Sequence, residues 1–559
     1  MSEPTLNQRW AAELIGSLVA GGVRHAVIAP GSRSTPLALA CADRPDLRVW
    51  SVIDERSAAF FGLGLAKSKR APVAVICTSG TAGAHFLPAV IEAGEGAMPL
   101  VLLTADRPWE LHGFGSPQTI EQTSLFGRYV RVAESLPSPD EQALGHLGSV
   151  VGRAMMVGRD GPIHFNVPFR EPLAAPDGSA GPVVNPRVPC FSARRSLPDL
   201  SELERAIRAS ERGLIICGPR ERDDAFGVAV HRLGAKLGFP VLAEAASNAR
   251  YGFPDAITWY DAMVRHTGLA RSLAPDLVVR FGGGLTSKYP QQWLDASSAK
   301  TFVVAEDDRL FDPSHRAVGF VAAGAPELCA ALERSLPAGQ QSFRERFLQV
   351  QRELESRVTK HDSMLTEPFI ARALVETLPE GASLFVSSSM PIRDVDAFAT
   401  KAQGRLRVFS NRGVNGIDGV TSTALGVAAG TGSPTALLVG DVALLHDLSG
   451  WLIAKKHQLS LTVVCVNNDG GGIFQFLPVA DRTPHFEALF GTPHGVDLSH
   501  LAALAGATLH RPSTVEAYRR AVQQGISGGG LHLIEARTER RANVDHHRAL
   551  YASLTEGMS

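Results

Sequence analysis

The chain has little cysteine and almost no net charge. Its six cysteines, among 559 residues, lack the paired spacing that metal-binding thiols need. Most lie in apolar stretches, as reduced core thiols do, which predicts a cytoplasmic location. The 55 Lys and Arg residues balance 56 Asp and Glu residues, so composition provides no basic surface for nucleic acid or an anionic membrane. We therefore expect small molecules and further copies of the chain as partners.

Long hydrophobic runs are also missing. No apolar stretch is long enough to span a bilayer, and the first residues lack the basic-then-apolar layout of a signal peptide. We therefore expect no membrane segment. At 559 residues the chain exceeds the size of one hydrophobic core, and this length favours three or four domains.

Short apolar strands, each followed by a turn and a helix, recur along the chain. After a helix at 7–20, the first strands are predicted at 26–29, 49–53, 73–77, 100–103 and 163–167. Such repetition is typical of parallel sheets covered by helices on both faces. A segment rich in Pro, Gly, Ser and Ala at 174–198 reads as a linker, and a charged helix is expected at 341–360. We predict an α/β protein of three doubly wound parallel-sheet domains, at 1–175, 195–340 and 361–559.

The central domain carries a run of three glycines, Gly282 to Gly284, after a predicted strand at 277–281. Its other strands are predicted at 213–217, 240–243 and 301–304. A glycine run can cradle a phosphate, but without a complete dinucleotide fingerprint a tight turn is the better interpretation.

Two oxygen-bearing side chains follow neighbouring apolar strands in the last domain. Asp441 follows the strand 435–439, and Asn468 follows the strand 461–466, with an amphipathic helix between them. Ligands of open α/β sheets bind at the carboxyl ends of the strands. Magnesium prefers oxygen ligands and is usually held by one or two protein groups and by phosphate oxygens. The alternative is that Asp441 caps a helix and Asn468 belongs to a turn.

This pattern resembles the cofactor motif of the thiamine-diphosphate-dependent enzymes, which runs from Gly-Asp-Gly to Asn-Asn. Val442 stands where the motif has its second glycine, a departure that concerns the local backbone and leaves both ligands in place. The resemblance implies thiamine diphosphate and Mg²⁺, with Mn²⁺ as an alternative. It implies a metal site of Asp441, Asn468 and a backbone carbonyl near Gly470.

Glu55 follows the second predicted strand and begins a helix that runs through Phe61. In the same enzymes a glutamate of the pyrimidine-binding domain reaches the cofactor's aminopyrimidine ring, and Glu55 matches it. The resemblance implies that Glu55 is catalytic, because sharing a proton with that ring activates the cofactor. The alternative is that Asp54 and Glu55 complement the helix dipole.

The loops of the first and last domains resemble those of one family among the thiamine-diphosphate-dependent enzymes. The segments 29–36, 104–108, 411–413, 416–419 and 471–474 are similar to those of the 2-succinyl-5-enolpyruvyl-6-hydroxy-3-cyclohexene-1-carboxylate synthases of menaquinone biosynthesis. That family implies a transferase, a carboligase that decarboxylates 2-oxoglutarate and adds the resulting succinyl-semialdehyde carbanion to isochorismate. It also implies a homodimer, with a tetramer as an alternative, and domains that bind the pyrimidine and diphosphate ends of the cofactor on either side of a non-catalytic domain.

Both substrates are dicarboxylates, which call for arginines with planar, bidentate forks. The resemblance implies a substrate pocket of Ser32, Arg33, Arg107, Gln118, Lys288, Ser389, Arg393 and Arg412. The cofactor would contact Glu55, Ser389, Gly413, Ile417, Gly440, Asp441, Asn468, Gly470, Ile473, Phe474 and Leu477. Either Ile417 or Val414 would be the bulky residue that bends the cofactor.

Simpler interpretations stay open for single residues. Ile473, Phe474 and Leu477 have the spacing of ordinary helix core. An arginine is by default a surface group or an ion pair, which we expect of Arg24, Arg220, Arg540 and Arg541. A structural role is equally compatible with His85, His112 and His446.

Two other functions compete with this interpretation. Acetohydroxyacid synthases and simple 2-oxo-acid decarboxylases act on small apolar substrates, which do not need so many loop arginines. Nucleotide binding by the central domain would instead indicate an oxidoreductase or a sensor, but the chain lacks the complete fingerprint.

Overall fold

A computed structural model describes residues 3–175, 177–189, 196–221, 224–307, 309–358 and 363–558. Cys190, part of the predicted linker and the end of the predicted helix at 341–360 lie outside these ranges. The described part of that helix is α14, Ser342–Val358. The other five cysteines are buried and form no disulfide with one another, as predicted.

The chain forms two compact units. The first consists of Met1–Ala193, Gly413–Gly432 and His446–Leu459, and the second of Arg194–Arg412, Ser433–Leu445 and Ser460–Ser559. The three predicted domain boundaries are not tested by this division and stay a proposal.

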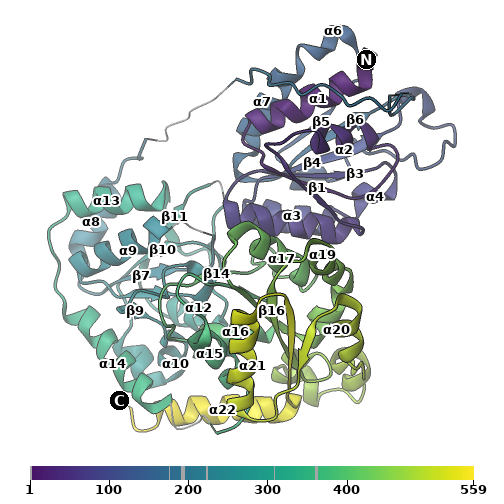
Figure 1. The fold of residues 1–559 in the computed structure, drawn as a ribbon. Helices are drawn as coiled ribbons and strands as arrows, with labels where there is room; N and C mark the ends of the chain where they lie inside the picture. The colour runs from purple at the N-terminus through teal and green to yellow at the C-terminus, as the bar shows by residue number, and fades with distance from the viewer. Residues whose placement is uncertain are drawn as a thin grey trace. The chain divides into compact units, whose positions relative to one another are not determined.

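A six-stranded parallel sheet forms the centre of the first unit, with the order β2-β1-β3-β4-β6-β5. Its strands are β1 His25–Ile28, β2 Arg48–Ser51, β3 Val73–Cys77, β4 Leu100–Asp106, β5 Val132–Ser135 and β6 Ile163–Pro168. Helices cover both faces of the sheet (Figure 1), and they include α1 Leu6–Ala20, α2 Thr35–Ala42, α3 Glu55–Lys69, α5 Leu87–Gly96 and α7 Leu147–Val157. All of the strands expected here are present.

Helix α3 continues to Lys69, beyond the predicted Phe61, and packs closely against α17, Val420–Thr431. Glycines allow this approach. A Cβ on Gly64 would lie 2.0 Å from the Thr423 carbonyl oxygen, and one on Gly426 would lie 2.1 Å from the Phe61 carbonyl oxygen. The packing fixes α3, which carries Glu55 in its first turn.

We expect Gly64→Ala to destabilise the first unit by about 1–3 kcal/mol, because the added methyl would overlap the α17 backbone. Thermal unfolding of the purified variant measures this loss as a fall of several degrees in the melting temperature. Gly145→Ala is the matched control, because a Cβ there meets nothing within 4 Å and the backbone φ is −68°. Equal melting temperatures for the two variants would contradict the close α3–α17 contact.

The second unit contains two more six-stranded parallel sheets. One has the order β12-β11-β10-β7-β8-β9, which is the doubly wound order 3-2-1-4-5-6 when counted from β7. Its strands are β7 Gly213–Cys217, β8 Val241–Ala243, β9 Ala256–Ile257, β10 Leu277–Phe281, β11 Lys300–Ala305 and β12 Ala317–Ala322. At its switch point the glycine run forms a tight turn: Gly282 has φ +84°, and a Cβ there would lie 2.5 Å from the Gly218 carbonyl oxygen.

The remaining sheet has the order β14-β13-β15-β16-β18-β17, the same relative order as in the first unit. Its strands are β13 Ser383–Val386, β14 Arg407–Phe409, β15 Thr435–Gly440, β16 Leu461–Asn467, β17 Thr508–His510 and β18 Leu531–Arg537. Its core includes apolar side chains from α15 Glu367–Thr377, α16 Met390–Phe398 and α21 Val515–Gly528. The last long helix is α22, Arg540–Thr555. The predicted fold, three doubly wound parallel sheets, is confirmed.

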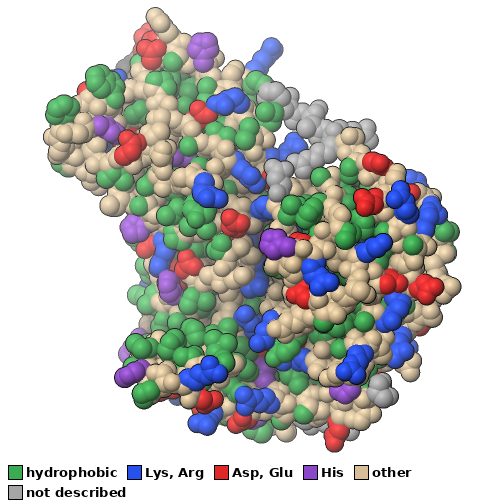
Figure 2. Space-filling model, turned by 180° about the vertical axis from the view of Figure 1, so that it is seen from behind, with side chains coloured by type: hydrophobic (Ala, Val, Ile, Leu, Met, Phe, Trp, Pro, Cys, Tyr) green, Lys and Arg blue, Asp and Glu red, His purple; other side chains and the backbone are tan. Residues whose placement is uncertain are grey.

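Charges of both signs are mixed on the surface. Figure 2 shows Lys and Arg interspersed with Asp and Glu over the displayed face, in keeping with a formal net charge of −1. Among the described residues, no helix has both the length and the apolar character needed to cross a membrane.

Candidate active site

Asp441 and Asn468 lie at the carboxyl ends of neighbouring parallel strands, as predicted. β15 pairs with β16, with Gly440 opposite Val466. Asp441 begins α18, Asp441–His446, and is 2% exposed. Asn468 follows the last residue of β16. Both oxygen-bearing side chains therefore belong to the sheet edge where ligands of this architecture bind.

Backbone N–H groups hold the Asp441 carboxylate in place. Gly470 N donates to one oxygen over 2.9 Å, and Val442 N donates to the other over 2.7 Å. Burial raises the pKa of Asp441, and these two hydrogen bonds oppose the rise. Val442 lies in the first turn of α18, so the position does not need the backbone freedom of glycine. The departure from the family motif therefore leaves the carboxylate correctly bound.

Asn468 presents one amide oxygen that has no hydrogen-bond partner. Its Nδ2 donates to Glu367 Oε1 over 3.0 Å, which orients the amide, while its Oδ1 is buried and unpartnered among the described residues. Leaving a buried oxygen unpaired costs about 1–3 kcal/mol, so the orphan oxygen indicates a missing ligand. An Asp oxygen and an Asn oxygen suit Mg²⁺.

The backbone around these ligands leaves room for a diphosphate. A Cβ built on Gly440 would meet no atom within 4 Å, and the carbonyl of Gly470 accepts one hydrogen bond, from Gly472 N over 2.9 Å. In the described ranges, no three His, Cys, Asp or Glu side chains form a complete metal cluster. Two oxygen side chains and a backbone carbonyl would be too few for Mg²⁺ by themselves and would need phosphate oxygens to complete its shell. These residues fit a magnesium diphosphate group.

A pocket of about 380 Å³ in the second unit brings together four predicted residues: Lys288, Arg393, Ile473 and Leu477. Lys288 begins α12, Lys288–Asp295, and Arg393 lies on α16. Arg265 and Arg548 add two cations that the sequence analysis did not identify. The pocket is therefore lined by basic side chains, by the carboxylates of Asp261, Asp394 and Asp396, and by an apolar wall.

The apolar wall comes from a 3-10 helix, Gly472–Phe476, and from Leu477 after it. Ile473 and Phe474 are half-buried and Leu477 is 45% exposed, so they do not form ordinary helix core. Phe474 packs edge-on against Phe490, with ring centroids 5.7 Å apart, and does not line the pocket.

Ser389, Arg393 and Arg412 follow the ends of β13 and β14. Ser389 has φ +76°, a strained conformation for a residue other than glycine, and such strain concentrates at functional sites. Arg393 Nη1 donates to the Ser389 carbonyl oxygen over 2.5 Å. Burial and the nearby charge of Arg412 lower the pKa of Arg393, so the two cations are neighbours.

Arg33, Arg107 and Gln118 meet at the carboxyl edge of the sheet in the first unit. Arg33 is 7% exposed and donates to the Phe169 carbonyl oxygen over 3.0 Å, but its Nε is buried without a partner among the described residues. Arg107 donates to Ser79 Oγ and to the Gln118 carbonyl oxygen. Burial and the charge of Arg33 lower the pKa of Arg107. The two arginine side chains therefore lie close together, and the Nε–H donor of Arg33 is not used by any contact among the described residues.

Ser32 is exposed in the loop before α2, where its carbonyl oxygen accepts hydrogen bonds from the backbone and hydroxyl of Thr35. The Ser32 side chain is therefore accessible at the same sheet edge.

Glu55 is half-buried in the first turn of α3. Asp54, not Glu55, caps this helix by accepting from Ser57 N over 2.9 Å. The Glu55 carboxylate forms no hydrogen bond or ion pair with another described residue, although its charge, after burial, helps to raise the pKa of Cys77. Glu55 lies in the first turn of α3, where an acidic side chain also complements the helix dipole, so the dipole alternative stays open beside the catalytic role.

Gly413 and Ile417 belong to the first unit, where a buried glutamate anchors their loop. The backbone N–H groups of Gly413 and Val414 donate to the two oxygens of Glu92, each over 2.8 Å. Ile417 is half-buried and Val414 is 47% exposed, which leaves both as candidates for shaping the cofactor.

The sequence analysis missed several buried carboxylates, and Glu92, Glu244 and Glu367 are among them. Glu92 and Glu367 lie on helices and resemble surface residues in sequence. Glu244 directly follows β8, the same position after a strand that identified Asp441, so its signal was present. Burial, and then the charge of Asp396, raise the pKa of Glu244.

Two of the arginines expected to be surface groups or ion pairs, and two of the histidines whose role was left open, form ordinary contacts. Arg220 pairs with Asp307, and Arg540 pairs with Glu487 over 2.7 Å. A hydrogen bond over 3.1 Å joins His112 Nε2 to the Arg107 carbonyl oxygen, and the His446 carbonyl oxygen accepts from Arg56.

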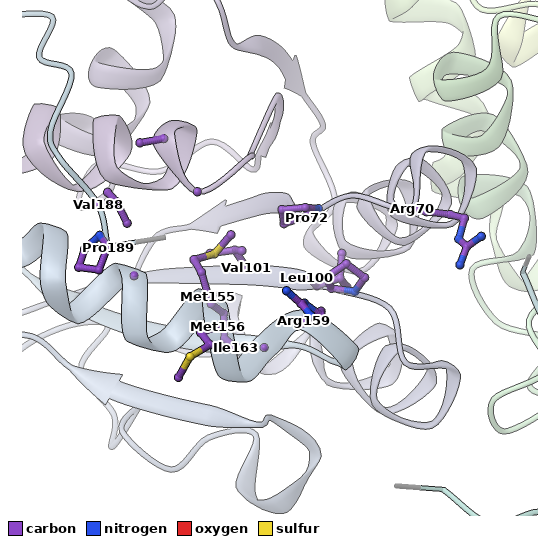
Figure 3. Close-up of a pocket in the computed structure, with 15 residues that line it drawn as sticks. Arg70, Pro72, Leu100, Val101, Met155, Met156, Arg159, Ile163, Val188 and Pro189 are labelled. Atoms are coloured by element: carbon purple, nitrogen blue, oxygen red, sulfur yellow. The ribbon is translucent and has the colours of Figure 1, made fainter. Parts of the chain in front are cut away.

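A further pocket, of about 310 Å³, lies at the opposite edge of the sheet in the first unit (Figure 3). It is lined by residues at the starts of β4 and β6, by Met155 and Met156 of α7, and by Val188 and Pro189. Ligands of open α/β sheets bind at the carboxyl edge, so this pocket is separate from the candidate active site.

Three family models of thiamine pyrophosphate enzymes match the chain. Residues 9–125 match the thiamine pyrophosphate enzyme N-terminal TPP binding domain, residues 196–386 its middle domain, and residues 397–536 its C-terminal TPP binding domain. A benzoylformate decarboxylase structure from Polynucleobacter necessarius superposes with a TM-score of 0.73. The alignment covers 96% of this chain and 99% of that one at 18% identity, which supports the fold alone.

Relatives with much higher identity cover the whole chain. A 2-succinyl-5-enolpyruvyl-6-hydroxy-3-cyclohexene-1-carboxylate synthase from Myxococcus xanthus is 52% identical over 100% of this chain and 99% of its own. The synthase of the same name from Geobacillus kaustophilus is 44% identical over 97% of each chain. The chain therefore belongs to the 2-succinyl-5-enolpyruvyl-6-hydroxy-3-cyclohexene-1-carboxylate synthase family of thiamine-diphosphate-dependent enzymes.

Proposed function

We propose that this enzyme decarboxylates 2-oxoglutarate and joins the remaining four-carbon semialdehyde unit to isochorismate, with thiamine diphosphate and Mg²⁺ as cofactors. The observation that carries the proposal is the set of cations at the carboxyl edges of the sheets. In the second unit, Lys288 and Arg393 line a pocket with an apolar wall. In the first, Arg33 and Arg107 are adjacent. Two dicarboxylate substrates need such a set.

Each group has a distinct task in this proposal. Asp441, Asn468 and the Gly470 carbonyl would hold the metal, with Mn²⁺ as an alternative to Mg²⁺. Bound thiamine diphosphate supplies the electron sink for decarboxylation. Glu55 would hold the proton that it shares with the cofactor ring. The arginines would orient the substrate carboxylates, and Ile473 and Leu477 would exclude water from the reacting carbon.

Omission of single components tests the proposal directly. Purified enzyme with 2-oxoglutarate, isochorismate, thiamine diphosphate and Mg²⁺ should consume both substrates, and leaving out any component should stop the reaction. Pyruvate in place of 2-oxoglutarate distinguishes an acetohydroxyacid synthase, and an absorbance scan for flavin tests the nucleotide-binding alternative. Sustained turnover with pyruvate alone would contradict the proposal.

We expect Arg393→Lys to weaken the use of one dicarboxylate. A lysine keeps the charge but loses the planar fork, and a lost charge-assisted hydrogen bond of about 1.5–3 kcal/mol corresponds to roughly a 10- to 100-fold rise in KM. Steady-state kinetics with each substrate varied in turn measures it. Arg519→Lys, at a partly exposed ion pair with Glu376, is the control and should leave KM unchanged. An unchanged KM for both substrates in Arg393→Lys would remove this arginine from the pocket.

The proposal includes a homodimer, with a tetramer as an alternative, because the family resemblance implies that each cofactor site takes residues from two subunits. The cytoplasmic location predicted from the cysteines is part of the same proposal.

A further inference from the structure

The loop that carries Lys288 is attached to two buried carboxylates. Glu244 Oε1 accepts from Thr286 N over 2.5 Å, and Glu244 Oε2 accepts from Thr286 Oγ over 3.1 Å. Ser287 Oγ donates to Asp261 Oδ1. Glu244 is 1% exposed and Asp261 is 2% exposed. Both residues that immediately precede Lys288 are thus bound by side chains that water does not reach.

These carboxylates connect the loop to the rest of the pocket. Asp261 Oδ2 accepts from Arg265 Nε over 2.7 Å and from the Tyr551 hydroxyl, and both partners line the same pocket as Lys288. Glu244 lies close enough to Arg412 for that charge to oppose the rise in its pKa. The attachment therefore lies among the predicted substrate-binding groups.

The Lys288 side chain makes few contacts with the rest of the protein. Its side chain is exposed, and its ammonium group lies 5.3 Å from the centroid of the Tyr289 ring. A lysine side chain loses up to about 2 kcal/mol of rotamer entropy when it is fixed. Its direction into the pocket consequently depends on the backbone at 286–288, which the buried carboxylates determine.

We propose that Glu244 is a positioning residue that acts through Thr286, with Asp261 as the second anchor, to aim Lys288 at a substrate carboxylate. The inference rests on the proposed function for the role of Lys288. In this proposal Glu244 does not contact the substrate, and its main effect on KM comes through the loop.

Hydrogen exchange tests the attachment without any substrate. In Glu244→Ala, exchange of the Thr286 amide should accelerate by about tenfold or more, because its buried acceptor is lost. Asp276→Ala is the matched control: Asp276 accepts three hydrogen bonds at the other end of β10. The control should leave exchange at 284–290 unchanged. If the Thr286 amide of Glu244→Ala exchanged at the same rate as in the wild-type enzyme, the proposal would be overturned.

A double-mutant cycle then tests whether Glu244 acts through Lys288. Glu244→Ala should raise KM about tenfold for the one substrate whose KM is also raised in Lys288→Ala, with a smaller effect on kcat. The double variant should be no worse than Lys288→Ala alone. Glu244→Gln should retain near wild-type KM, because its oxygen can accept from Thr286 N while its NH₂ donates to Thr286 Oγ. If the rise in KM of the double variant equalled the product of the rises in the two single variants, the proposal would be overturned.

Two outcomes stay distinguishable. If wild-type enzyme uses neither proposed substrate, the proposed function fails, and the exchange experiment still decides the attachment. If Glu244→Ala does not fold, Thr286→Val takes its place, since it removes the hydroxyl donor and keeps the backbone N–H. It should raise the same KM by a few-fold, and an unchanged KM in this variant would overturn the proposal.

Discussion

Glu55→Gln should lower turnover by about 10²-fold or more while thiamine diphosphate still binds. The amide keeps the shape of the carboxylate but cannot share the proton, and loss of a positioned acid–base group typically costs 10² to 10⁴ in rate. The structure supports this role because the half-buried Glu55 carboxylate has no partner among the described residues, whereas Asp54 caps the helix. Steady-state turnover and a separate cofactor titration measure the two effects independently.

Glu3→Gln, an exposed glutamate of the same unit, is the control and should keep full turnover. Near-normal turnover of Glu55→Gln would remove Glu55 from the reaction. A loss of cofactor binding equal to the loss of turnover would make Glu55 a binding residue instead.

Asp441→Ala should weaken the binding of Mg²⁺ and thiamine diphosphate together, by roughly 10- to 100-fold. The metal would bridge the carboxylate and the diphosphate, and one charge-assisted contact corresponds to about 1.5–3 kcal/mol. Cofactor titration by calorimetry, at several metal concentrations, measures the change without reference to activity. Asn468→Ala should show the same coupled loss to a smaller extent, because an amide oxygen carries no full charge.

Asp545→Ala is the matched control, since Asp545 is an exposed aspartate of the same unit. It should bind cofactor and metal as wild type does. An Asp441→Ala variant with unchanged cofactor affinity would place the metal elsewhere in the protein.

The buried strands could be predicted from sequence because they read as continuous apolar runs. The observed bounds of β3, β7 and β10 are the same as the predicted ones. The edge strands β5 and β17 escaped notice because their residues are mixed in polarity. The edge strand β12 was missed although its residues are apolar or glycine, and Val318 and Phe320 are half exposed there. A neighbouring strand, β18, was missed because it contains Glu535, which is buried only through its pairing with Asn467, Arg511 and Arg537.

The residues of the candidate site also fall into a predictable group and a group that the sequence did not reveal. Asp441 and Asn468 directly follow strands, and parallel topology carries strand ends to one edge, so their neighbourhood was predictable. The buried glutamates that hold the loops of the site could not be predicted. Glu92 reaches the backbone of Gly413 across 321 positions, and no local pattern on α5 distinguishes it from a surface glutamate. Such contacts depend on packing between distant helices and loops, which spacing in the sequence does not specify.

The central claim is tested most directly by following the carbon of 2-oxoglutarate labelled at its 1-carboxylate. With isochorismate present, the wild-type enzyme should release one labelled CO₂ for each isochorismate consumed, and the product should contain the four remaining carbons of 2-oxoglutarate joined to the isochorismate skeleton. Label release with isochorismate left unchanged, or preferential consumption of pyruvate, would contradict the proposed reaction.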